Sequence, residues 1–299
     1  MKPNGLIIYD EKAMDILPPD SHAEQLVAGY QFTEGPVWHP DGYLLFSDIP
    51  ANKMYKLERE GFATVVLDPS GFTGKDEAGL SEMIGSNAIA INSKKQVIFC
   101  QHGNHAIAAL EENGFSIITD SFEGKPLNSP NDLVICSSDD IFFTDPPYGL
   151  KDQMLHPTTH QPRGGVYKIK DGETKLIYEG FRYPNGICLS PDEKHLYVSS
   201  NHPDEPRIMK FELTKDGEIK GQSIFIEQNA DGIKTDRLEN LYLCTDKGIL
   251  VVSASGRRLA LIKLPETPYN IAWGGPGKST LFITASAGVY SFHTLLKNH

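Results

Sequence analysis

A polar residue stands at the head of each of six related phrases in this 299-residue sequence, and it is always Glu, Asp or Asn. These head residues are Glu34, Asn87, Asn131, Asn185, Asp231 and Asn270. Carboxylate and amide oxygens are the ligands that hard divalent cations prefer in proteins. If the six side chains face one point, they offer a cation two carboxylates and several amide oxygens. At any single position, however, Asn or Asp is explained equally well as an ordinary turn residue.

The head residues must be positioned by the elements that follow them. After each phrase comes a turn and a short run rich in β-branched and aromatic residues, which is typical of a strand. These runs are Tyr43–Ser47, Gln96–Cys100, Ile141–Thr144, His195–Ser199, Leu241–Thr245 and Thr280–Thr284. Successive head residues, at 34, 87, 131, 185, 231 and 270, are 53, 44, 54, 46 and 39 residues apart. Repeats of roughly 40–50 residues with several strands are typical of β-propellers. We therefore predict an all-β chain, a six-bladed β-propeller with four-stranded blades around a central channel.

The same repeat predicts how the ring closes. The last phrase leaves room for little more than a hairpin, whereas Gln25–Tyr30 precedes the first phrase and is left over. We predict that this run supplies the outer strand of the last blade, which would remove an open sheet edge. The expected organisation is one propeller domain over residues 24–299, with residues 1–23 as a leading segment outside the propeller body.

The charge balance limits the classes of partner. The chain has 28 Lys and Arg against 39 Asp and Glu, a formal net charge of −11. Nucleic acids and anionic membranes require basic surfaces, so neither is expected as a partner. Residues 1–20 lack the basic start and the long apolar stretch of a signal peptide, and the sequence contains no apolar run of about 18 residues. These features favour a cytoplasmic location.

Two further segments carry candidate chemistry. His102 stands at the end of the strand-like run of the second blade, where it could reach the channel for a substrate or proton-transfer role, or could cap the strand. The polar stretch Tyr148–Gly165 lies between two strands and is a candidate lid at the channel mouth. The sequence has no G-x-S-x-G nucleophile elbow and no H-E-x-x-H metal motif.

Several phrases together resemble the SMP-30/gluconolactonase/luciferin-regenerating-enzyme family, and the resemblance spans roughly residues 24–295. Its stretches are Phe32–Trp38 (FTEGPVW), Ser129–Leu133 (SPNDL), Phe143–Leu150 (FTDPPYGL), Tyr183–Ile187 (YPNGI) and Ala230–Ile233 (ADGI). The first and third are the most specific, and the third looks most like the bacterial gluconolactonase branch.

Membership would imply a six-bladed propeller that hydrolyses sugar lactones with one divalent cation in its channel. That cation is commonly Ca²⁺, with Zn²⁺, Mg²⁺ or Mn²⁺ as alternatives. The resemblance implies Glu34, Asn185 and Asp231 as metal ligands, with Asn131 as a further ligand or a substrate contact. Two positions depart from the family pattern. Ala88 follows Asn87 where Gly is usual, and His105 stands where Arg is common.

A lactonase mechanism assigns further roles. A metal ion can polarise the lactone carbonyl, and a protein base is then useful for activating water. We expect Asp231 to be that base, with His102 as the second choice. Asn87, Asn131, His102 and Tyr148 are expected to contact the substrate. Two rival hypotheses remain: hydrolysis of an aryl ester or phosphotriester on the same metal, and a Ca²⁺- or sugar-binding propeller with no turnover. The oligomeric state is not predicted.

Overall fold

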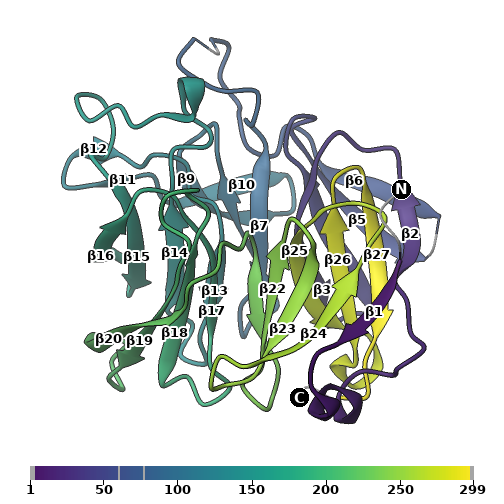
Figure 1. Cartoon of the computed structure of the whole chain (residues 1–299). Helices are drawn as coiled ribbons and strands as arrows, with labels where there is room; N and C mark the ends of the chain where they lie inside the picture. Colours follow the sequence, from purple (N-terminus) through teal and green to yellow (C-terminus); the bar gives the residue numbers. More distant parts are fainter. Residues whose placement is uncertain (1–3, 60, 77, 297–299) are drawn as a thin grey trace.

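The computed structural model describes residues 4–59, 61–76 and 78–296, and it confirms the predicted all-β propeller. Six antiparallel sheets surround a central channel, and the described residues contain three short 3₁₀ helices but no α-helix (Figure 1). The innermost strands contact one another in a closed ring, in the order β3, β7, β13, β17, β21, β25 and back to β3. None of the helices found is long and apolar enough to cross a membrane, as far as the described residues go.

Every blade is an up-and-down sheet whose first strand lines the channel. Blade 1 consists of β3 (Thr33–His39), β4 (Tyr43–Asp48), β5 (Lys53–Arg59) and β6 (Phe62–Leu67). Blade 2 consists of β7 (Ser86–Ile91), β8 (Val97–Gln101), β9 (Ala106–Glu111) and β10 (Gly114–Thr119). Blade 3 consists of β13 (Leu133–Ile135), β14 (Ile141–Asp145), β15 (Gly164–Lys170) and β16 (Glu173–Phe181). Blade 4 consists of β17 (Pro184–Leu189), β18 (His195–Ser200), β19 (Ile208–Leu213) and β20 (Ile219–Ile226). Blade 5 contains β21 (Ile233–Thr235), β22 (Leu241–Thr245), β23 (Gly248–Val252) and β24 (Arg258–Lys263). Blade 6 consists of β25 (Pro268–Gly274), β26 (Thr280–Ala285) and β27 (Gly288–His293), together with β2 (Glu24–Ala28). A short hairpin, β11 (Ser121–Phe122) and β12 (Lys125–Pro126), lies between blades 2 and 3.

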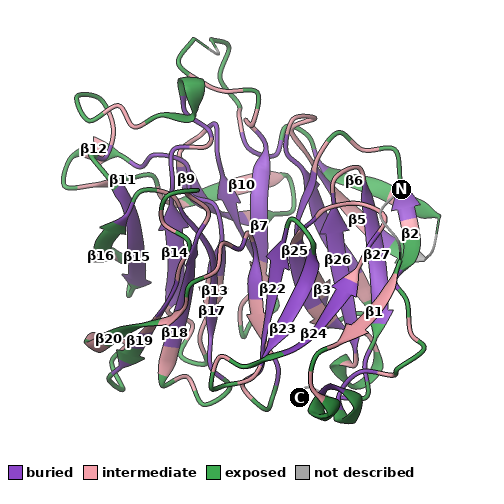
Figure 2. Ribbon diagram, viewed as in Figure 1, coloured by how far each residue is buried: buried purple, intermediate pink, exposed green. Residues whose placement is uncertain are grey.

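The core lies between neighbouring blades. The second strands β8, β14 and β22 are buried along their whole length, because apolar side chains on both faces pack against an adjacent sheet (Figure 2). The fourth strands β6, β10 and β20 are intermediate or exposed at nearly every position. This burial explains why the second-strand runs are the clearest strand signals in the sequence.

The predicted ring closure is confirmed. β2 pairs antiparallel with β27, with Ala28 opposite Gly288 and Glu24 opposite Ser291. The strand falls within the predicted run except at its first residue, and it completes the sheet of blade 6. The N-terminal part of the chain therefore closes the sheet made by the C-terminal part.

The expectation for the leading segment is wrong in one respect. β1 (Gly5–Ile8) pairs antiparallel with β24 and becomes a fifth strand of blade 5, instead of lying outside the propeller body. The 3₁₀ helix η1 (Glu11–Asp15) follows, and Ala13, Ile16 and Leu17 are buried in the cluster shared by blades 5 and 6. An outer strand presents unpaired backbone groups, and four residues of suitable pattern were enough to cover them.

Two long loops lie at the end of the channel where the head residues are found. The first joins β6 to β7 and the second joins β14 to β15, where the sequence predicted a loop at Tyr148–Gly165. An isolated bridge pairs Leu80 with Leu150, and the Ser81 amide donates to the Gly149 carbonyl. The second loop carries the 3₁₀ turn η2 (Lys151–Gln153). A third such turn, η3 (Pro276–Lys278), precedes β26.

Candidate functional site

Irregularities at the starts of the inner strands place the head residues at one end of the channel. Glu34, Asn87 and Asn185 are each the second residue of an inner strand, and Asn131 and Asp231 lie two residues before β13 and β21. The strand register shifts between Glu34 and Val37, and the corresponding shifts occur in β7, β17 and β25. Such bulges turn a side chain away from the regular pleat and are common beside active sites.

Glycines beside the head residues allow the inner strands to approach closely. Gly35 has φ +56°, and a Cβ there would lie 2.0 Å from the Asn87 carbonyl oxygen. At Gly186, a Cβ would lie 2.3 Å from the Asp231 carbonyl oxygen. A side chain at either position would push neighbouring blades apart, so the Glu-Gly and Asn-Gly pairs have a structural reason.

Three of the head residues form a chain of amides. The Asn87 Nδ2 donates to Asn131 Oδ1 at 2.7 Å, and the Asn131 Nδ2 donates to Asn185 Oδ1 at 2.9 Å. The Asn185 Nδ2 in turn donates to the Tyr148 hydroxyl at 3.3 Å. The structure therefore brings Asn87, Asn131, Asn185 and Tyr148 together, as four of the predicted site residues. All three amides are buried.

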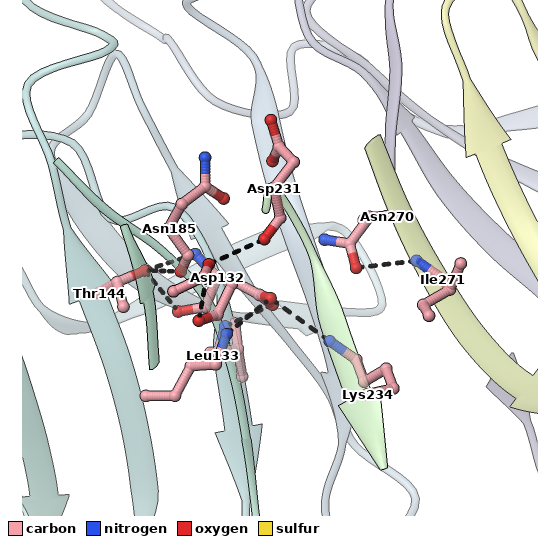
Figure 3. Close-up of polar contacts among 12 residues, drawn as sticks. Asp132, Leu133, Thr144, Asn185, Asp231, Lys234, Asn270 and Ile271 are labelled. Atoms are coloured by element: carbon pink, nitrogen blue, oxygen red, sulfur yellow. Dashed lines mark hydrogen bonds and ion pairs between the residues drawn. The ribbon is translucent and has the colours of Figure 1, made fainter. Parts of the chain in front are cut away.

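Two carboxylates complete this end of the channel. Glu34 is buried, and burial together with the nearby charge of Asp231 raises its pKa well above the ordinary range. Burial, and then the charge of Asp132, raises the pKa of Asp231 to about 7. Glu34 Oε2 accepts from the Gly35 amide at 2.7 Å, and Asp231 Oδ2 accepts from Asn201 Nδ2 at 3.0 Å. In Figure 3, Asp231 and Asn185 are directed toward the same side.

The donor set fits a hard divalent cation. Burial raises the pKa of both carboxyl groups, and the charge of Asp231 adds to the rise at Glu34, so a cation would stabilise the ionised pair; amide oxygens lie at the same end of the channel. Asn87 Oδ1 is buried and has no hydrogen-bond partner among the residues that the structure describes, so an acceptor oxygen remains unused here. Within the described part of the chain, no three His, Cys, Asp or Glu side chains form a group that could hold a metal. A cation would therefore depend on the Asn oxygens as well as on Glu34 and Asp231.

His102 lies behind the amides, fully buried. Its Nδ1 is 3.1 Å from the Met83 carbonyl oxygen, which assigns the ring proton to that nitrogen. Its Nε2 then accepts from Asn87 Nδ2 at 3.2 Å, and burial lowers its pKa to about 4. Neutral His102 therefore helps to orient Asn87, and it is 3.3 Å from Asn131 Oδ1.

Sequence reasoning missed a buried ion pair next to the site. Lys234 Nζ lies 3.3 Å from Asp132 Oδ2, and Asp132 also accepts from the amides of Leu133 and Ile187 (Figure 3). Burial opposes the charge on Lys234, but Asp132 outweighs it and raises the lysine pKa. Lys234 is the only lysine or arginine in the six inner strands, and that was an available signal for a buried acidic partner.

The second loop is attached to blade 2 by histidine rings. The rings of His105 and His160 meet edge to face with centroids 4.8 Å apart. Tyr148 lies near the start of this loop, and the centroid of its ring is 5.6 Å from that of Tyr183. His105, where an Arg is common in the resembled family, therefore contributes to loop packing at the channel end.

Comparisons with known proteins agree with this architecture. The family model "SMP-30/Gluconolactonase/LRE-like region" matches residues 32–287. A gluconolactonase of Zymomonas mobilis is 33% identical over 295 residues, covering 93% of this chain and 83% of the relative. A solved gluconolactonase structure from Xanthomonas campestris has a TM-score of 0.82 at 25% identity, covering 98% of this chain and 97% of that one. A calcium-binding protein, regucalcin, from Agrobacterium tumefaciens shares the fold with a TM-score of 0.72 at 16% identity, covering 92% and 96%.

Proposed function

This chain belongs to the SMP-30/gluconolactonase/LRE-like family and is a lactonase, and we propose that it opens sugar lactones at the channel end lined by Glu34 and Asp231. The observation that carries the proposal is the convergence of two carboxylates of raised pKa with a chain of buried amides at that end. The carboxylates suit a cation, and the amides can both donate to and accept from sugar hydroxyls.

We propose one divalent cation as the cofactor, with Ca²⁺ as the first choice and Zn²⁺, Mg²⁺ or Mn²⁺ as alternatives. Glu34, Asn185 and Asp231 would hold it, with Asn131 as a fourth ligand or a substrate contact. Oxygen-only donors favour a hard cation such as Ca²⁺ over Zn²⁺, which prefers nitrogen and sulfur. Such a cation would supply Lewis-acid polarisation of the lactone carbonyl and a lowered pKa for a bound water.

The side chains of the protein would perform the remaining tasks. Asp231 is the proposed base that takes a proton from the attacking water, since its carboxylate lies at the channel end beside Asn201. Asn87, Asn131 and Tyr148 would orient the sugar hydroxyls. His102 remains the second candidate base, and its contacts with Asn87 and Asn131 also support a substrate-positioning role.

Proton release from glucono-lactone, measured with and without EDTA, tests the activity. We expect acceleration over spontaneous hydrolysis that EDTA abolishes and added Ca²⁺ restores. Turnover that EDTA leaves unchanged would remove the cation from the mechanism, and no acceleration at all would favour a binding propeller. A matched panel of aryl esters and phosphotriesters would show whether a lactone is the preferred substrate class.

Two variants separate the candidate bases. Asp231→Asn should lower kcat by about 10²–10⁴-fold, the usual contribution of a positioned base. His102→Gln preserves an amide acceptor beside Asn87, so we expect it to raise KM more than it lowers kcat. Circular dichroism would check that both variants are folded. Activity retained in Asp231→Asn, together with activity lost in His102→Gln, would transfer the role of base to His102.

The remaining proposals concern the location of the protein and the class of its partners. A cytoplasmic location rests on the sequence features described above. A small-molecule lactone as the partner follows from the family, and the chain's acidic balance gives no reason to expect nucleic acid or a membrane.

A further inference from the structure

The ends of the second strands hold the head residues of the blades that follow them. The next-to-last residue of β4, β14 and β18 carries a hydroxyl group, which donates to the backbone carbonyl of a head residue in the next blade. The pairs are Ser47 with Asn87 at 2.8 Å, Thr144 with Asn185 at 2.7 Å (Figure 3) and Ser199 with Asp231 at 2.9 Å. Side chains two residues apart in a strand share a face. The residue just after each second strand is therefore placed to reach a head residue as well.

Two of these residues do contact the side chain of a head residue. His102 directly follows β8, and its Nε2 accepts from Asn87 Nδ2 at 3.2 Å. Asn201 directly follows β18, and its Nδ2 donates to Asp231 Oδ2 at 3.0 Å. His102 and Asn201 thus occupy equivalent positions in blades 2 and 4. His102 lies beside the amides of the site, whereas Asn201 lies beside one of its carboxylates.

Contacts from neighbouring segments hold Asn201 in place. Its backbone amide donates to the Tyr183 carbonyl oxygen at 3.1 Å, and the ring of the next residue, His202, stacks on the Tyr183 ring with centroids 5.2 Å apart. The Asn201 side chain is half-buried. Burial raises the pKa of the Tyr148 hydroxyl, and a hydrogen bond to Asn201 is one of the contacts that oppose this rise. Asn201 is therefore an ordered donor that lies between the second loop and the site.

We propose that Asn201 is a positioning residue of the lactonase, which holds the Asp231 carboxylate in the orientation that a cation and an attacking water require. This inference rests on the proposed role of Asp231 as ligand and base. The terminal torsion of an aspartate is broad, so an N–H group that donates to Oδ2 restricts it. Loss of the outer contacts that orient metal ligands typically costs about 10–100-fold in metal affinity or activity.

Asn201→Leu removes the N–H donor and keeps a side chain of similar size. We expect Ca²⁺ affinity, measured by calorimetry, to weaken by about tenfold or more, and kcat for glucono-lactone to fall by about 10–100-fold. KM should change little, because the amides that face the substrate remain. Asn201→Gln retains an N–H donor and should recover part of both losses. Unchanged Ca²⁺ affinity and kcat in Asn201→Leu, or an Asn201→Gln variant that is no better, would overturn the proposal.

A matched control uses a half-buried Asn at the other end of the channel. Asn92 directly follows β7, and its Oδ1 accepts from the amides of Lys94 and Gln96 within its own turn. Asn92→Leu should lower stability but leave Ca²⁺ affinity and kcat unchanged. Equal losses in Asn92→Leu and Asn201→Leu would reveal a general effect of replacing a half-buried amide and would contradict the proposal. Circular dichroism checks folding, and Asn201→Ala replaces Asn201→Leu if the latter does not fold.

A double-mutant cycle tests the contact without cation or substrate. Urea denaturation in EDTA compares the original chain with Asn201→Leu, Asp231→Asn and the double variant. Asn201→Leu should destabilise the original chain more than it destabilises Asp231→Asn, because only the carboxylate loses a charge-assisted hydrogen bond. Additive changes would show that the two side chains do not interact and would overturn the proposal.

Failure of the proposed function would look different. The original chain would then neither bind Ca²⁺ nor open glucono-lactone, and this inference would fail together with the role of Asp231. An original chain that does both, with a Ca²⁺ affinity and a kcat that survive Asn201→Leu, would overturn the inference alone.

Discussion

At the scale of single residues, the site places two acids where neither is well solvated. Burial raises the pKa of both Glu34 and Asp231, and the charge of Asp231 adds to the rise at Glu34. Their charges therefore destabilise the folded chain unless a cation or a proton compensates them. Such a site lowers the stability of the chain without a cation and raises its affinity for one, and both effects can be measured.

Glu34→Gln should raise the stability of the chain without a cation and lower its stabilisation by Ca²⁺. In EDTA the variant should melt at a higher temperature than the original chain, by an amount equivalent to about 1 kcal/mol, because one repelling buried charge is removed. With saturating Ca²⁺ the order should reverse, since the original chain gains binding energy and the variant gains little. Thermal melts with and without Ca²⁺ check this. A variant that is less stable under both conditions would contradict carboxylate repulsion at the site.

For the Asp132–Lys234 ion pair we expect the opposite effect, because removing one of its charges should destabilise the folded chain. Lys234→Met leaves the buried Asp132 carboxylate without its ion-pair partner, so unfolding free energy should fall by about 3 kcal/mol. Asp132→Asn combined with Lys234→Met should lose less than the two single changes together. Urea denaturation of the four chains gives the coupling energy directly. Additive losses would mean that the 3.3 Å contact contributes nothing to stability.

At the scale of elements, the inner strands position the site through bulges and close approaches. Gly186→Ala puts a methyl group 2.3 Å from the Asp231 carbonyl oxygen, where the backbone must move. We expect a loss of about 2 kcal/mol and reduced lactonase activity, because Asn185 and Asp231 are displaced together. Gly221→Ala, in the outer strand β20, is the matched control, since its nearest neighbour would be 3.5 Å away. Equal stability of the two variants would show that the contact between Gly186 and the Asp231 carbonyl can accommodate a methyl group without loss of stability.

The sequence was sufficient for the elements that repeat. The second strands could be found because they are buried on both faces and therefore read as uninterrupted apolar runs. The head residues could be found because they share a phase, and the closing strand β2 because it was left over by the count. In each case, a regular pattern along the chain corresponds to a regular position around the channel.

Features set by a single tertiary contact could not be found in this way. Asp132 and Lys234 are 102 residues apart, and neither repeats in other blades. The four residues of β1 are too few to show strand alternation, and their role depends on the free edge of β24. The cavity lined by Val37, Ile91 and Trp273 is likewise formed by residues from five inner strands that only the closed ring brings together.

At the scale of the whole molecule, the segment that follows β1 meets the last described residues of the chain where blades 5 and 6 join. Ala13, Ile16 and Leu17 from the N-terminal side share a core cluster with Tyr242 and Phe292 of those blades. Leu296, near the other end, belongs to the same cluster, and the Leu295 amide donates to the Ile16 carbonyl oxygen at 2.9 Å. Two N-terminal segments thus contact the closing blades: β2 pairs with β27 in blade 6, and residues 13–17 pack in the core cluster that blades 5 and 6 share.

Leu17→Ala tests whether the packing of residues 13–17 between blades 5 and 6 stabilises the propeller. Leu17 is 0% exposed, so truncation should cost about 2–4 kcal/mol of unfolding free energy and shift the single cooperative transition of the propeller. Met14→Ala, three residues earlier and 42% exposed, should cost no more than about 0.5 kcal/mol. Calorimetry distinguishes the possibilities. A separate early transition in Leu17→Ala, with the main transition unmoved, would show that the leading segment is an independent attachment to a ring that β2 alone closes.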